Sequence, residues 1–175
     1  AWAARPRGVT VLKSLAEHKI DHYHVGPAEG YEESTMAQNC RQHIGCLDLP
    51  AEDWAMPSDA DLWPIRKEYY QEASDWGICY NANMDHYSTL PTCHVSLPMV
   101  IWRELYKVKA GDNMAAAIKF SLDPWLETYR ERWPWPDRGF AVWMSDQAMM
   151  TDKLRAQPWY NRLKMVERQG QPGPD

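Results

Sequence analysis

Apolar residues along the first half of the chain recur at helical spacing in three stretches. Thr10 can cap a short helix, and Gly45 can end a second helix that begins near Tyr31. Ser58 followed by Asp61 resembles a capping box and predicts a third helix. Within each stretch the apolar residues share one helix face. These residues are Val11, Leu12, Leu15 and Ala16; Met36, Cys40 and Ile44; and Leu62, Ile65, Tyr69, Ala73 and Trp76.

The second half of the chain has shorter helical patterns, separated by prolines and glycines. We expect one helix between Pro98 and Gly111 and another over residues 113–120. Asp123-Pro124 is expected to begin a new helix, because proline is favoured in a first turn. Two further helices are predicted, one at residues 145–156 and a last one that starts at Pro158 and carries Trp159, Leu163 and Val166.

No strand-type alternation persists for more than a few residues, and the run Trp133-Pro134-Trp135-Pro136 cannot be helical. The sequence therefore predicts a mostly α protein, with several short helices joined by long ordered connections and extended Trp/Pro-rich arms. We expect an N-terminal arm and short helix at residues 1–30, followed by a helical body with four cysteines at residues 31–132. A Trp/Pro segment, C-terminal helices and a tail are expected at residues 133–175.

Composition adds an unusual supply of large apolar side chains: 10 Trp, 9 Tyr and 9 Met against 2 Phe. Trp, Tyr and Met are enriched at protein interfaces, although an aromatic core explains the same numbers. The net charge of −5 gives no basic footprint, so we expect no nucleic-acid partner. Residues 26–63 contain eight acidic residues and a single basic one, Arg41. Residues 151–169 instead contain more basic than acidic residues.

No apolar run approaches the roughly 18 to 20 residues of a membrane span, so we expect no transmembrane segment in this chain. A peripheral position on a membrane complex is compatible with this pattern. The chain begins Ala1-Trp2-Ala3 without a methionine, which is expected after removal of a targeting segment or in a partial sequence.

All four cysteines lie between residues 40 and 93, as the pairs Cys40/Cys46 and Cys79/Cys93. Five and thirteen residues separate the members of the pairs, which matches neither zinc-site spacing nor a Cys-x-x-Cys redox motif. We predict two disulfides, Cys40–Cys93 and Cys46–Cys79. Buried thiols are one alternative, and a zinc site that uses some of His43, His86 and His94 is another.

Familiar catalytic and cofactor motifs are absent from the sequence, including phosphate-binding glycine loops and nucleophile elbows. Cys93 and His94 are adjacent, and in an extended stretch their side chains would point to opposite faces. They are therefore not predicted to act as a catalytic pair. We expect no catalytic residue, no cofactor and no bound metal.

The aromatic run and the helix after it are the strongest candidates for an interaction surface. Trp133 and Trp135 lie on a stiff backbone that would lose little entropy on docking. We predict Trp133, Trp135 and Trp143 as interface residues. The alternative is that the two Trp rings of the run fold back onto the helices of their own domain.

These features together resemble the supernumerary (accessory) subunits of mitochondrial respiratory-chain complexes, which are small, rich in Trp, Tyr and Pro, mostly helical and without catalytic motifs. The resemblance covers about residues 31–95, and the cysteine spacings differ from the twin Cys-x9-Cys pattern of some such subunits. It implies a structural subunit bound to other subunits at the inner membrane, on the intermembrane-space side if the cysteines are oxidised.

A second resemblance covers residues 154–160, which look like the turn before the last helix of glutathione-transferase-type chains. The alternative function is therefore a small Cys/His metal-binding or transferase-like enzyme domain. The leading prediction is a non-catalytic structural subunit that acts through protein–protein contacts.

Overall fold

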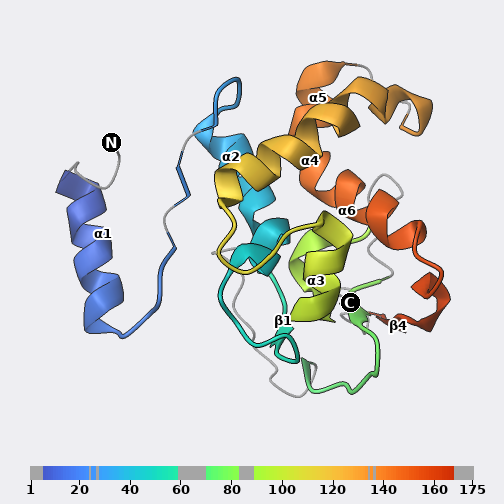
Figure 1. Cartoon of the computed structure of the whole chain (residues 1–175), viewed down its shortest axis with the longest axis horizontal. Helices are drawn as coiled ribbons and strands as arrows, with labels where there is room; N and C mark the ends of the chain where they lie inside the picture. Colours follow the sequence, from blue (N-terminus) through green and yellow to red (C-terminus); the bar gives the residue numbers. More distant parts are fainter. Residues whose placement is uncertain are drawn as a thin grey trace, which may run out of the picture.

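Helices surround a core of large side chains, and a small sheet lies along one side of them (Figure 1). The computed structural model describes residues 6–23, 25–26, 28–58, 70–82, 89–133, 135 and 137–167. The predicted mostly α class is confirmed. The α-helices are α1 (Pro6–Glu17), α2 (Glu33–Cys40), α3 (Met99–Tyr106), α4 (Met114–Thr128), α5 (Arg138–Trp143) and α6 (Ser145–Arg155). Short 3-10 helices η2 (Arg41–Cys46), η4 (Thr92–His94), η5 (Tyr129–Glu131) and η6 (Tyr160–Arg162) adjoin them.

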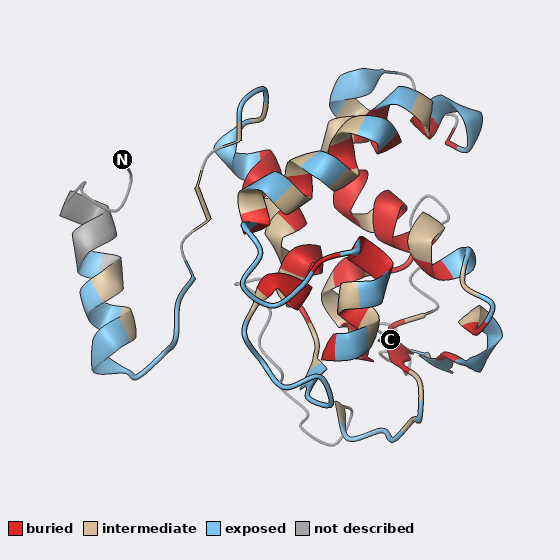
Figure 2. Ribbon diagram, in the orientation of Figure 1, coloured by how far each residue is buried: buried red, intermediate tan, exposed pale blue. Residues whose placement is uncertain are grey.

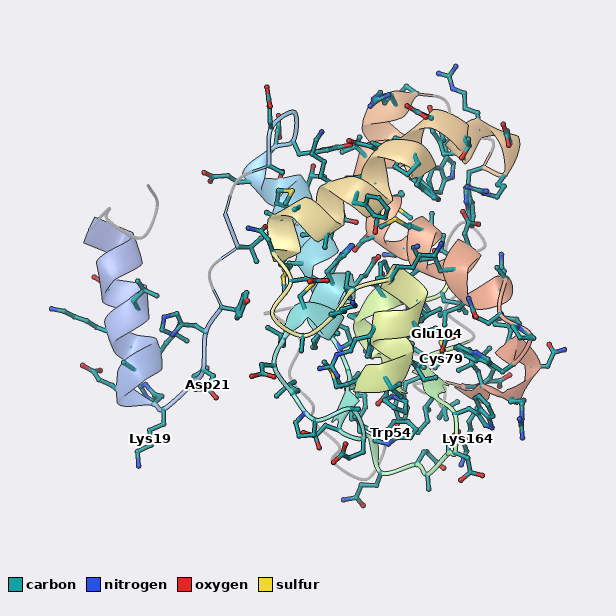
Figure 3. The ribbon with its side chains drawn as sticks, in the orientation of Figure 1. Lys19, Asp21, Trp54, Cys79, Glu104 and Lys164 are labelled. Carbon is teal, nitrogen blue, oxygen red and sulfur yellow. The ribbon has the colours of Figure 1, made fainter. Side chains whose placement is uncertain are left out.

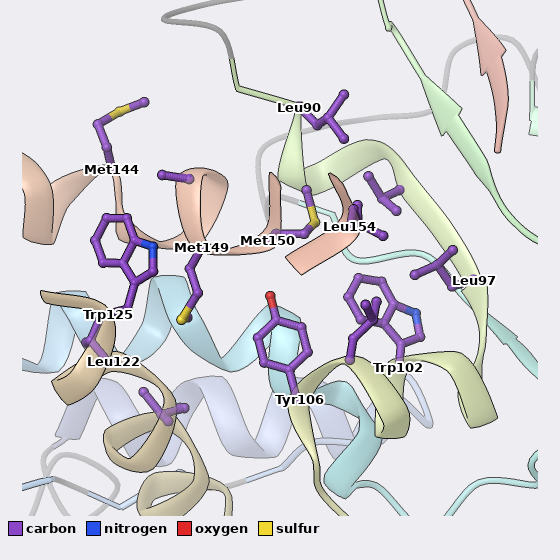
Figure 4. Packing of buried hydrophobic residues seen from close by; sticks show 14 of the residues in the cluster. Leu90, Leu97, Trp102, Tyr106, Leu122, Trp125, Met144, Met149, Met150 and Leu154 are labelled. Atoms are coloured by element: carbon purple, nitrogen blue, oxygen red, sulfur yellow. The ribbon is translucent and has the colours of Figure 1, made fainter. Parts of the chain in front are cut away.

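The core forms where α2, η2, α3, α4 and α6 pack against one another. Ile118 and Leu122 of α4 and Met149 of α6 are wholly buried, as are Trp102 and Leu97 nearby. Figure 4 shows the Trp102 and Tyr106 rings on α3 facing the Met150 and Leu154 side chains of α6. The core is therefore built mainly from Trp, Met and Leu, as the composition requires.

Polar groups are also buried in this core. His43 Nδ1 lies 2.9 Å from the Asn39 carbonyl oxygen, and its Nε2 lies 3.2 Å from Ser121 Oγ on α4. Burial lowers the pKa of His43 to about 4, so the ring is neutral at pH 7. Arg41 pairs with the buried carboxylate of Asp146 at 2.5 Å, which joins η2 to α6.

A sheet of four short strands joins segments that are far apart in sequence. Its strands β1 (Trp54–Ala55), β2 (Ile78–Tyr80), β3 (Val95–Pro98) and β4 (Lys164–Val166) stand in the order β1-β3-β2-β4. β3 runs antiparallel to β1 and β2, and β4 runs parallel to β2, with Cys79 opposite Met165. Gly77 permits this packing, because a Cβ there would lie 2.3 Å from Leu97 Cδ2 and 2.7 Å from Leu163 Cδ2.

Several of the predicted element boundaries are wrong. α1 begins at Pro6, so Thr10 lies inside it rather than capping it, and the helix predicted from Tyr31 to Gly45 is α2 followed by η2. Asn113 caps α4 by accepting a hydrogen bond from the Ala116 amide, and the helix continues through Pro124 to Thr128 without the predicted break. The last predicted helix is absent from the described residues: after Pro158 the chain makes the turn η6 and then strand β4. Most of the helix predicted from Ser58 lies outside the described residues.

α1 stands apart from the rest of the molecule, at the end of an extended segment (Figure 1). The side chains of α1 that are described are exposed or partly exposed, whereas the body has a red, buried centre (Figure 2). The predicted N-terminal arm therefore has a definite form, a helix held away from the body. The C-terminal residues 137–167 instead share the core of residues 33–133, because α6 packs against α2 and α4.

Candidate functional site

The four cysteines occupy four different elements. Cys40 and Cys46 end α2 and η2, while Cys79 lies on β2 and Cys93 lies in η4. All four are thiols, so neither predicted crosslink, Cys40–Cys93 or Cys46–Cys79, is formed. Burial is the main cause that raises the pKa of Cys46 to about 11 and that of Cys79 to about 12. These two thiols are therefore protonated at pH 7.

Cys93 and His94 are in contact, which the sequence reasoning missed. The Cys93 Sγ and His94 Nδ1 atoms lie 2.9 Å apart. The prediction that adjacent side chains point to opposite faces assumed an extended chain, but Thr92–His94 form the 3-10 turn η4. Pro91 is the only sequence signal for such a turn. Its carbonyl oxygen accepts a hydrogen bond from the His94 amide.

Trp133 and Trp135 are buried, with 5% and 9% of their surfaces exposed. Their rings stack on each other with centroids 5.0 Å apart, and Trp135 also packs against Trp125 and Phe140. The prediction of these two side chains as interface anchors is therefore wrong. The Trp135 ring packs onto α4 and α5 and the Trp133 ring stacks on it, because burying two indole rings in the core is favourable.

One carboxylate oxygen holds this aromatic cluster. Asp152 Oδ2 on α6 accepts hydrogen bonds from Trp125 Nε1 at 2.9 Å and from Trp133 Nε1 at 3.1 Å. The half-exposed Arg132 places its Nε 3.0 Å from the same oxygen. Asp152 thereby satisfies two buried indole N–H groups.

Trp143, the third predicted interface residue, ends α5 with 62% of its surface exposed. Its position is consistent with a role in binding, and the role itself stays a prediction. Phe120 on α4 is likewise exposed, at 71%.

Three other large apolar side chains are exposed on one region of the surface. Leu49, Trp54 and Val100 are 40%, 44% and 50% exposed. The segments that carry them adjoin, because the 47–55 segment pairs with β3 and the start of α3: the Val100 amide donates to the Ala51 carbonyl, and Trp54 stands opposite Pro98. We call Leu49, Trp54 and Val100, with the exposed acids beside them in the 47–55 segment, the acid-rimmed patch. These acids are Asp48, Glu52 and Asp53.

The arm that carries α1 is fixed to the body at its base. Tyr31 donates a 2.5 Å hydrogen bond to Asp123 on α4, and Lys119 lies 3.0 Å from the other oxygen of that carboxylate. Lys119 also lies over the Tyr31 ring. The Tyr31 hydrogen bond, followed by Lys119, lowers the pKa of Asp123. The arm therefore leaves the body at a defined point, while the turn at Lys19 and Asp21 stays far from it (Figure 3).

Among the residues that the structure describes, no group of three or more His, Cys, Asp or Glu side chains could hold a metal ion. Nor does any helix of that part have both the length and the apolar character needed to cross a membrane.

Comparison with known proteins identifies no relative: no family model, no curated protein and no solved structure matches this chain.

Proposed function

We propose that this chain is a non-catalytic structural subunit that binds other proteins of a larger assembly through its N-terminal arm. The observation that carries the proposal is α1, a 12-residue amphipathic helix held away from the body (Figures 1 and 2). Leu12 and Leu15 on α1 are partly exposed, and Ile20 and Tyr23 on the connecting segment are 53% and 56% exposed.

The stability of α1 supports this role. Isolated helices shorter than about 12–15 residues are marginal in water, so α1 depends on burial of its apolar face. Each leucine that becomes fully buried in a complex contributes about 1.5–3 kcal/mol, relative to full exposure. A protein partner with an apolar groove would supply that burial, as it does for other amphipathic helices that bind in grooves.

The reach of the arm also suits a subunit that bridges neighbours. The segment between Glu17 and Tyr31 spans up to about 45 Å when fully extended. Its base is held by the Tyr31 hydrogen bond to Asp123 and by Lys119, which lies over the Tyr31 ring. A fixed base limits the volume that α1 explores, which reduces the entropy lost when it binds.

The acid-rimmed patch and Trp143 supply further surfaces for the same function. Exposed Trp side chains are frequent energetic anchors at interfaces. The acids beside Leu49 and Trp54 favour a partner that carries positive charge at the rim of the contact. Binding at several such surfaces would be typical of a subunit that fills the space between larger proteins.

The sequence resemblance to supernumerary subunits of mitochondrial respiratory-chain complexes extends the proposal to the identity of the assembly. On this basis we propose a complex of the inner mitochondrial membrane, with this chain peripheral to the bilayer. The cysteines of the structure are thiols. We therefore do not propose that the chain lies on the oxidising side of the membrane.

The test compares two single glutamate substitutions one residue apart on α1. Leu15→Glu changes the partly buried face, and Ser14→Glu changes the exposed face with the same added charge. Each tagged chain is expressed in its native host, and the fraction that migrates in a high-mass assembly is measured by native electrophoresis. Cross-linking with mass spectrometry then identifies the neighbours of α1.

We expect Leu15→Glu to reduce the assembled fraction at least tenfold, with Ser14→Glu close to wild type. Wild-type chain that migrates only as a monomer would contradict the proposal. Equal incorporation of the two variants would show that the arm is not the binding element.

A further inference from the structure

A thiol, an imidazole and a second thiol lie close together where η4 joins β3. The turn of η4 holds the Cys93 Sγ atom 2.9 Å from His94 Nδ1, which is within reach for proton transfer. The Tyr70 ring stacks on the His94 ring, with centroids 6.4 Å apart and planes inclined by 9°. Tyr70 packs in turn on Tyr80 of β2, with centroids 5.1 Å apart. The imidazole is therefore held in place beside the thiol.

The second thiol is Cys79, on the neighbouring strand. Cys79 stands opposite Val95 in the antiparallel pair of β2 and β3, and Cys93 precedes Val95 by two residues. The turn η4 therefore places Cys93 at the start of β3, beside the part of β2 that carries Cys79. The negative charge of a Cys93 thiolate is the second cause of the raised pKa of Cys79, after burial, which agrees with this proximity.

Solvent access distinguishes the two sulfur atoms. Cys79 is fully buried, whereas Cys93 is half-buried, as is His94. A solute can therefore reach Cys93 first, and Cys79 can react only with a group already attached to Cys93. An accessible, activated thiol followed by a buried one is the arrangement that thiol–disulfide exchange requires.

We propose that Cys93 is a nucleophilic thiol that reacts with small-molecule disulfides, with His94 as its base and Cys79 as the resolving thiol. This activity goes beyond the proposed structural role and does not depend on it. A small disulfide of the glutathione type has the required chemistry, because it supplies both the electrophilic sulfur and the oxidising equivalents.

The exchange proceeds in two balanced steps. His94 Nδ1 takes the proton of Cys93, and the thiolate attacks one sulfur of the disulfide RSSR. The S–S bond breaks, and the leaving RS⁻ takes the proton back from His94 as RSH. Cys79 then attacks the Cys93 sulfur of the mixed disulfide, and its proton leaves with the second RSH. Two protein thiols are oxidised to one Cys79–Cys93 disulfide, and one RSSR is reduced to two RSH.

The chain contains a matched control thiol. Cys40 is half-buried like Cys93, but it has no imidazole partner in the described contacts, and its Sγ donates to the Ala37 carbonyl at 2.9 Å. Burial raises the pKa of Cys40 above its usual value. Exposure being similar, a difference in reaction rate between Cys93 and Cys40 reports the effect of the site around Cys93.

The experiment treats the full reduced chain with oxidised glutathione at pH 7 and follows each cysteine by peptide mass mapping. In wild type we expect a Cys79–Cys93 disulfide, formed at least tenfold faster than any adduct on Cys40. In Cys79→Ser we expect a stable glutathione adduct on Cys93. In His94→Gln we expect reaction at Cys93 to slow about tenfold, with the circular dichroism spectrum unchanged, because few ordinary thiols are ionised at pH 7.

Three outcomes would overturn the proposal. Cys40 reacting as fast as Cys93 in wild type would show that His94 does not activate the thiol, and this comparison stands even if the His94 variant fails to fold. A persistent glutathione adduct on wild-type Cys93 would exclude Cys79 as the resolving thiol. No adduct on Cys93 in the Cys79→Ser variant would exclude Cys93 as the nucleophile.

Discussion

Replacing Asp152 should destabilise the protein through the two indole groups that it binds. Trp125 and Trp133 are 6% and 5% exposed, and both donate their Nε1–H to Asp152 Oδ2. Asp152→Ala removes the acceptor and leaves two donors where water has little access. A buried donor without a partner costs about 1–3 kcal/mol, so two such groups cost about 4 kcal/mol at mid-range.

The ion pair with Arg132 adds little to this sum. The Arg132 side chain is 46% exposed, and exposed ion pairs contribute about 0–1 kcal/mol. Asp152→Asn should therefore be milder than Asp152→Ala, at about 1–2 kcal/mol, because an amide oxygen can still accept from the indoles. Comparing the loss of stability in the two variants separates the effect of the hydrogen bonds from that of the charge.

Urea denaturation monitored by tryptophan fluorescence and by circular dichroism measures the free energy of unfolding of each variant. Glu127→Ala, an exposed acid on α4, is the control and should change this free energy by no more than about 0.5 kcal/mol. Asp152→Ala within about 1 kcal/mol of wild type would refute the reasoning, because the indoles would then have other partners.

Three further predictions concern stability. Gly77→Ala should destabilise the fold by about 2 kcal/mol or more on urea denaturation, because the new Cβ would overlap two leucine side chains; an unchanged midpoint would contradict the close packing. Burial gives His43 a pKa of about 4, against 6.5 for an exposed ring. Its contribution to stability is therefore full above pH 6.5 and falls by about 3 kcal/mol as the pH drops to 4. The difference in free energy of unfolding between wild type and His43→Gln should change over the same pH range. Trp159→Ala should cost about 3–5 kcal/mol because the ring is 8% exposed, and Trp143→Ala should cost no more than about 0.5 kcal/mol; similar melting temperatures for the two would contradict the burial difference.

The elements predicted correctly are α-helices of two turns or more. The helices around Met36, Leu105 and Ile118 each carry an apolar stripe of the right period, and Ser145 begins α6 as predicted. The sheet was missed because its strands have two to four residues, too few for alternation to be recognised.

The other misses come from tertiary contacts. Residues 164–166 form a strand because β2 offers a parallel partner, although the local pattern around Leu163 favours a helix. The stiff backbone of Trp133 and Trp135 favours a prediction of interface residues, but Asp152, which accepts the Trp133 hydrogen bond, lies 19 residues further along the chain. The contact between Cys93 and His94 depends on a three-residue turn with no strong local signature.

The pairing of β2 with β4 has a consequence for how the chain folds as it is synthesised. Val166 lies 86 residues after Tyr80, its partner in the sheet. At about 5–20 residues per second, the ribosome makes β4 roughly 4–17 s after β2. During that interval β2 has one unpaired edge, although Ile78, Cys79 and Tyr80 are all destined for burial. Unpaired strand edges promote aggregation. The nascent chain is thus most vulnerable between the synthesis of these two strands, and chaperone binding to nascent chains of different lengths would detect that period.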